Sequence, residues 1–138
     1  IKMAKLVPKI YPNDINENIP VGIGFPLIPG DPKQNFTTRK QIHDNLRNLI
    51  LTMKGERVMQ PTYGSDLYFL LFEPLDESDL TDAARQSIQT AVSEFMPFVE
   101  IKLIQVTVEQ DNSRVLIEVD YDVDGFPTPE VLNLTIEK

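Results

Sequence analysis

Cysteine and tryptophan are absent from this 138-residue chain, and histidine occurs once, at His43. Without cysteine the chain can form no disulfide, use no thiol nucleophile and offer no thiolate to a metal. A lone histidine provides no histidine pair for zinc and no nucleophile–base couple with cysteine, so we interpret His43 as a packing or surface residue. No apolar run approaches the ~18 residues that a membrane-spanning helix needs. We therefore expect no metal, no cofactor and no membrane-spanning segment.

Basic residues are outnumbered, with 13 lysines and arginines against 21 acids, which gives a net charge of −8. An acidic surface repels nucleic-acid phosphates and anionic lipids, and the sequence shows no local basic patch. We therefore expect neither nucleic acid nor a membrane as a partner. The length, with 41% hydrophobic and 25% charged residues, is typical of a single globular domain.

Prolines and glycines concentrate at the beginning of the chain. Residues 1–36 contain six of the eleven prolines and three of the six glycines. Because proline lacks an amide donor and glycine weakens regular structure, we predict an extended, irregular N-terminal arm over residues 1–36. The arm also carries five apolar residues between positions 21 and 28. It could pack back on its own domain or lie on a neighbouring subunit, and the sequence leaves both interpretations open.

Helical patterns follow in the predicted domain, residues 37–138. A capping box of Thr38 and Gln41 is predicted to start the first helix, and Lys54 with Gly55 is predicted to end it. Its apolar positions have helical spacing, and its polar face is expected to hold the charged residues. The apolar positions are Ile42, Leu46, Leu49, Ile50 and Met53, and the polar face is Arg39, Lys40, Asp44, Arg47 and Asn48. A short helix is predicted over 66–72, and a longer one over 78–96 is stopped by Pro97.

The last third alternates apolar and polar residues as strands do. The alternation from Val99 changes phase near Leu103–Ile104, which predicts either a β-bulge or a change of packing surface there. A hairpin turn at Asp111–Asn112 is predicted to lead into a second strand over 115–123, and a third runs over 131–137. The order of elements predicts an α+β fold: an arm, two main helices and a short helix, packed on a small antiparallel C-terminal sheet.

Two groups of carboxylates allow chemical interpretations that we consider weaker than a structural one. Residues 120–125 begin like a calcium loop, but Val131 occupies the position that needs a bidentate glutamate, and Glu130 comes one place early. An acid–base pair for sugar hydrolysis could draw on acids near loops. These acids are Glu73, Asp76, Glu77 and Glu94. A cluster at a helix start ordinarily compensates the helix dipole.

The most distinctive stretch is GERVMQPTYGSDL, residues 55–67, followed by LFEP at 71–74. Gly55 and Gly64 suit positive φ, and Pro61 fixes the backbone of the connector. Ser65 or Asp66 can cap the short helix, and Arg57 can pair with a carboxylate or with loop carbonyls. The residues that define this motif loop are Gly55, Arg57, Pro61, Tyr63, Gly64 and Asp66. Together with GIGFPL at 22–27 and the helix–Pro97–strand junction, the stretch resembles the baseplate wedge and sheath-initiator family of contractile phage tails, which has relatives in type VI secretion.

The resemblance implies a structural, non-enzymatic subunit of a virion tail baseplate, assembled in the host cytoplasm. Its expected partners are baseplate wedge proteins, bound through a helical bundle, and the tail sheath protein, bound by strand exchange. Tube-initiator proteins are a further candidate partner. On the first helix we expect the wedge contact at Ile42, Leu46, Arg47, Leu49 and Ile50. On the last strand we expect the sheath contact at Leu132, Leu134 and Ile136.

The same family is often labelled lysozyme-like, which makes a tail-associated cell-wall hydrolase the alternative function. Many members carry Glu-Pro-Arg where this chain reads Met96-Pro97-Phe98. The acid and the base of that motif are therefore missing here. This departure favours the structural interpretation over the enzymatic one, and it puts in doubt any partner contact made through that arginine.

Overall fold

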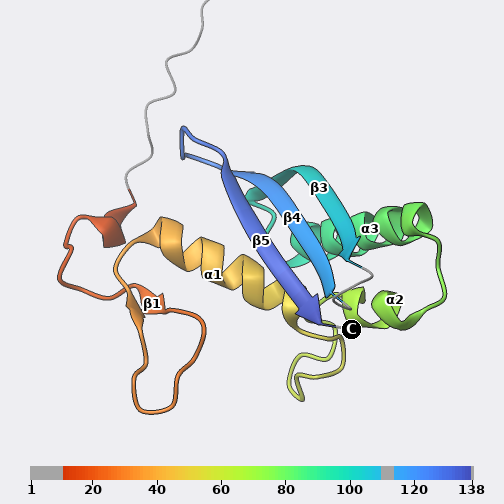
Figure 1. Cartoon of the computed structure of the whole chain (residues 1–138). Helices are drawn as coiled ribbons and strands as arrows, with labels where there is room; N and C mark the ends of the chain where they lie inside the picture. The colour runs from red at the N-terminus through yellow and green to blue at the C-terminus, as the bar shows by residue number, and fades with distance from the viewer. Residues whose placement is uncertain (1–10, 110–113, 138) are drawn as a thin grey trace, which may run out of the picture.

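The computed structural model describes residues 11–109 and 114–137 (Figure 1). The described part begins with a short 3₁₀ turn, two very short strands and a helix, continues with two more helices, and ends in three strands. In order these are η1 (Pro12–Asp14), β1 (Gly22–Ile23), β2 (Gln34–Asn35), α1 (Thr38–Leu51), α2 (Leu67–Phe72), α3 (Glu77–Phe95), β3 (Val99–Glu109), β4 (Arg114–Val123) and β5 (Glu130–Glu137). The predicted α+β fold is confirmed.

The main layer is an antiparallel sheet in the order β3-β4-β5, and the helices cover one face of it (Figure 1). Helix α3 contacts β3, α1 contacts β5, and α2 packs against both helices. Side chains alternate along β4, so that every second one, from Val115 to Val123, is buried against the helices. No helix of the described residues is long and apolar enough to cross a bilayer.

Strand β3 contains the predicted irregularity. Ile101 pairs with Tyr121 and Leu103 with Asp120, which leaves Lys102 as an extra residue between two regular stretches. The bulge is therefore confirmed, one or two residues before the predicted position. The predicted turn at Asp111–Asn112 lies outside the described residues.

Both ends of α1 differ from the prediction. Thr37, not Thr38, is the N-cap, and its hydroxyl accepts a hydrogen bond from the Lys40 backbone N–H at 3.3 Å. The helix ends at Leu51 rather than at Lys54–Gly55, because Thr52 has left helical geometry and its carbonyl accepts from the Ser65 backbone N–H at 2.9 Å. The tertiary contact with the following loop thus ends the helix one turn early.

The arm contacts its own domain at both of its ends. At one end Tyr11 donates a hydrogen bond to the Asp124 carbonyl at 2.8 Å and stacks on Phe126. Near the other end, Asn35 Nδ2 donates to the Asp44 carboxylate of α1 at 2.7 Å, and β1 pairs with β2 within the arm. Several apolar side chains between these points stay exposed. They include Ile15, Ile19, Ile23, Leu27 and Ile28. Over residues 11–36 the arm packs back on its domain and still leaves apolar surface uncovered; the boundary between an arm (1–36) and a domain (37–138) stays a prediction.

Candidate assembly surfaces

Strand β5 lies at one edge of the sheet. All eight of its residues pair with β4 without a shift in register, from Glu130 opposite Tyr121 to Glu137 opposite Arg114. The predicted contact residues Leu132, Leu134 and Ile136 point to the helices and are buried. What β5 can offer a partner is therefore its free backbone edge and its outward side chains, because these three side chains already fill the core.

A polar network holds the beginning of β5 against α1. The Tyr121 hydroxyl donates to Glu130 Oε2 at 2.8 Å and lies 2.9 Å from His43 Nδ1. Glu130 also forms an ion pair with Arg39, whose guanidinium donates to Thr128 Oγ1 at 2.7 Å. The network joins β4, β5 and α1, and it explains the single histidine as a partner of a buried phenol.

The charges of this network are set by burial and hydrogen bonding. Burial opposes ionisation of Glu130, but the hydrogen bonds from Tyr121 and Arg39 outweigh it and lower the pKa of Glu130. Burial, together with the Glu130 carboxylate, raises the pKa of Tyr121, so the phenol remains a neutral donor. The start of the edge strand is therefore fixed by a charge-assisted contact rather than by apolar packing alone.

The predicted wedge-contact residues of α1 divide into two groups. Ile42, Leu46, Leu49 and Ile50 are buried in the chain's own core, and Leu46 has no exposed surface at all. Arg47 is exposed and is the only one of the five that a partner can reach in this conformation. The wedge contact itself stays a prediction, and it now depends on the outward side chains of the helix.

Asp44, expected on the polar face of α1, is instead buried at 2% exposure. Its carboxylate accepts from Asn35 Nδ2 at 2.7 Å, from Lys40 Nζ at 2.7 Å and from the Phe25 backbone N–H at 3.3 Å. Burial opposes ionisation, but these hydrogen bonds outweigh it and lower the pKa of Asp44. Asp44 therefore anchors the arm to α1. The Lys40–Asp44 spacing of four residues was the one signal of this in the sequence.

The motif loop between α1 and α2 is folded on itself by backbone hydrogen bonds. The Gly55 N–H donates to the Pro61 carbonyl at 2.7 Å. Gly64 has a φ of 122°, and a Cβ there would overlap the Thr52 carbonyl. The positive φ expected of Gly55 and Gly64 is confirmed, and the loop closes on itself through these backbone contacts.

Two side chains of the motif loop make contacts other than those predicted. Arg57 pairs with no carboxylate of the described residues; its guanidinium stacks on the Tyr63 ring, 3.7 Å from the centroid. Asp66 makes no capping hydrogen bond with its side chain and pairs with Lys54 at 2.6 Å instead. Ser65 Oγ is the group that accepts from the Leu67 N–H, at 3.4 Å.

The carboxylates considered for chemistry do not converge. Asp120 and Asp122 lie on the outer face of β4, whereas Glu130 points to the helix side, so they cannot share a calcium ion. Among the described residues there is no group of three or more side chains suited to hold a metal. Glu77 begins α3 and Glu94 nearly ends it, which separates them by ~25 Å. A glycosidase pair needs about 5–10 Å.

A family model described as "Baseplate wedge protein gp25" matches residues 37–128. The protein of that name from Enterobacteria phage T4 is 29% identical over 89 residues, which is 64% of this chain and 66% of that protein. The chain therefore spans slightly less than two thirds of the length of the curated relative that it matches.

Two solved structures share the fold. A putative tail lysozyme from Geobacter sulfurreducens gives a TM-score of 0.66 at 20% identity, covering 73% of this chain and 91% of that one. A chain of the anti-feeding prophage baseplate gives 0.59 at 18% identity, covering 72% and 78%. At these identities the likeness concerns the fold alone, whereas the family model covers well over half of the chain. The chain belongs to the baseplate wedge protein gp25 family.

Proposed function

We propose that this chain joins the wedge proteins of a contractile-tail baseplate to the first ring of the tail sheath. In this role it starts the sheath by accepting a strand of the sheath protein on the edge of β5. The observation that carries the proposal is the outer edge of β5, which pairs with no further strand of the described residues, is continuous, and is anchored at its beginning by Glu130. An exposed strand edge recruits another strand through backbone hydrogen bonds.

The two edges of the sheet are not equally receptive. Strand β3, at the other edge, carries a bulge at Lys102, and both bulges and edge lysines discourage pairing with further strands. The described part of β5, Glu130–Glu137, contains no bulge, proline or lysine. This asymmetry supports β5 as the strand that receives a partner.

The wedge proteins are proposed to contact α1 from its outward side. The buried residues of α1 fix the helix on the sheet and leave Arg47 available for a carboxylate of a partner helix. An arginine suits such a contact because its guanidinium can form two parallel hydrogen bonds with one carboxylate. Tube-initiator proteins remain a further candidate partner.

Hydrogen exchange of the backbone amides tests strand addition directly. In the isolated chain, the β5 amides that do not bond to β4 are expected to exchange rapidly. In baseplates that carry the first sheath ring, the same amides are expected to be strongly protected. The free-edge amides of β3 serve as the internal control and should change much less. Equal exchange of the β5 amides in both states would rule out strand addition at this edge.

A hydrolase assay separates the structural role from the enzymatic alternative. The purified chain is expected to release no fragments from peptidoglycan, since Glu77 and Glu94 lie too far apart to act as a pair. Release of fragments that is abolished by Glu73→Gln or Glu94→Gln would contradict the structural proposal.

A further inference from the structure

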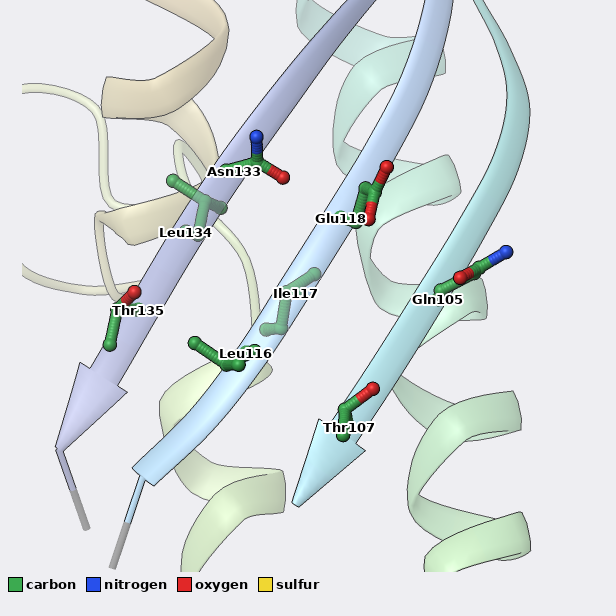
Figure 2. A pocket seen from close by; sticks show the side chains of 8 residues that line it. All are labelled: Gln105, Thr107, Leu116, Ile117, Glu118, Asn133, Leu134 and Thr135. Carbon is green, nitrogen blue, oxygen red and sulfur yellow. The ribbon is translucent and has the colours of Figure 1, made fainter. Parts of the chain in front are cut away.

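The outer face of the main sheet, away from the helices, is largely exposed in the described part of the chain. Figure 2 shows Glu118 on β4 between Gln105 of β3 and Asn133 of β5, with the helices behind the sheet. Leu116 lies in the next outward row, between Thr107 and Thr135. These six side chains surround a shallow depression of about 290 Å³.

Charges on this face are compensated at its two ends and not in its middle. Lys102 pairs with Glu100 at 2.8 Å and with Asp122 at 3.5 Å. At the opposite end Arg114 pairs with Glu137 at 3.4 Å. Between these pairs, Glu118 and Asp120 have no ion-pair partner in residues 11–109 and 114–137. Two neighbouring carboxylates of the central strand thus share one uncompensated patch.

Asp120 provides the second, independent observation. Its Oδ1 atom is buried and has no hydrogen-bond partner within the described part of the chain. In the strand register, Asp120 lies between Leu103 and Val131, which are 43% and 46% exposed. A shielded carboxylate oxygen that has no donor among the described residues, flanked by uncovered apolar side chains, is free to accept a hydrogen bond from a partner or from water.

We propose that this acidic sheet face, Leu103, Leu116, Glu118, Asp120 and Val131, is the docking site for a positively charged amphipathic segment of another baseplate protein. A lysine or arginine of that segment pairs with Asp120 and Glu118, and its apolar residues cover Leu103 and Val131. Charge complementarity selects this occupant, because a second copy of a chain of net charge −8 would bring like charges together. The inference rests on the proposed role in a baseplate, but not on strand addition at β5.

Carboxylate labelling with a carbodiimide tests the docking site in the intact assembly. Glu118 is expected to be labelled at least tenfold less in purified baseplates than in the free chain. Zero-length cross-links from Glu118 or Asp120 to a lysine of a different protein would support the assignment. Cross-links to Lys2, Lys5 or Lys9, or to a second copy of this chain, would overturn it, as would unchanged labelling of Glu118. If the β5 amides are protected but Glu118 is not, the docking proposal fails and strand addition stands. If Glu118 is protected but the β5 amides are not, strand addition fails and the docking proposal stands.

A pair of charge reversals provides the matched control. Glu118→Lys and Glu94→Lys each change the net charge by +2 at an exposed position, the first on the acidic sheet face and the second on α3. Both variants are expected to unfold at the temperature of the natural chain. Glu118→Lys is expected to enter baseplates at least tenfold less than Glu94→Lys. Equal incorporation of the two variants would overturn the proposal.

Discussion

Tyr121→Phe tests how much the hydrogen bond between Tyr121 and Glu130, which fixes the start of β5, contributes to stability. The replacement keeps the ring in the core and removes only the hydroxyl that donates to Glu130 and contacts His43. A hydrogen bond to a charged group contributes about 1.5–3 kcal/mol, and the partner left behind is only 22% exposed, so water replaces the donor poorly. We expect a loss of about 2 kcal/mol in the free energy of unfolding at pH 7.

The same variant has a pH dependence of known sign. Glu130 has a lower pKa in the folded chain than in the unfolded chain, so its ionisation stabilises the fold above the unfolded value of about 4.3. That contribution is lost as the pH falls through the lower folded value. Since Tyr121 supplies part of the shift, the difference between the natural chain and Tyr121→Phe should narrow below about pH 4.

Urea unfolding at several pH values measures both effects. Tyr68→Phe is the matched control, because Tyr68 is a half-buried tyrosine whose hydroxyl has no partner among the described residues. We expect the control to stay within about 0.5 kcal/mol of the natural chain. A loss in Tyr121→Phe no larger than in Tyr68→Phe, or one that does not change between pH 7 and pH 3, would refute the reasoning.

Three further changes have expected outcomes of different kinds. Gly64→Ala should lower the free energy of unfolding, measured in urea, by at least about 2 kcal/mol, and Gly55→Ala by only about 1 kcal/mol. Both glycines have positive φ, but only Gly64 lies against a backbone carbonyl. Equal losses in the two variants would contradict this reasoning. Arg47→Glu should leave stability within about 0.5 kcal/mol and reduce co-purification with wedge proteins. Asp44→Asn should speed proteolysis of residues 15–33 at neutral pH, since it removes the charge that holds the arm.

Helices α1 and α3 and strands β3, β4 and β5 were predictable because each carries its own periodic pattern, whereas the short strands β1 and β2 of the arm were not predicted. Alternation along β4 and β5 and the helical spacing in α1 and α3 are local properties, and the change of phase near Leu103 was sufficient to predict a bulge. The ends of α1 were not predictable in this way. Thr52 leaves the helix because its carbonyl bonds to Ser65, thirteen residues later in the chain.

The candidate surfaces were predictable as elements and not as side chains. The sequence indicated β5 and α1 as contact elements. The periodic spacing of apolar residues within one element does not show whether they pack on the chain's own core or on a partner. Leu134 and Leu46 proved to be core residues. Likewise, the hydrogen bonds between Asn35 and Asp44 and between Tyr121 and Glu130 depend on where the arm and β5 pack in the fold. A local sequence pattern does not contain this information.

The bulge at Lys102 has a consequence for stoichiometry. A sheet with two open borders could join its own copies end to end without limit, as fibres do. If the bulge keeps β3 from accepting a further strand, the proposed addition at β5 gives each copy a single additional strand, and two copies that pair through β5 form a closed twofold pair. Under the proposed strand addition, an assembly would therefore extend from this subunit on the β5 side alone.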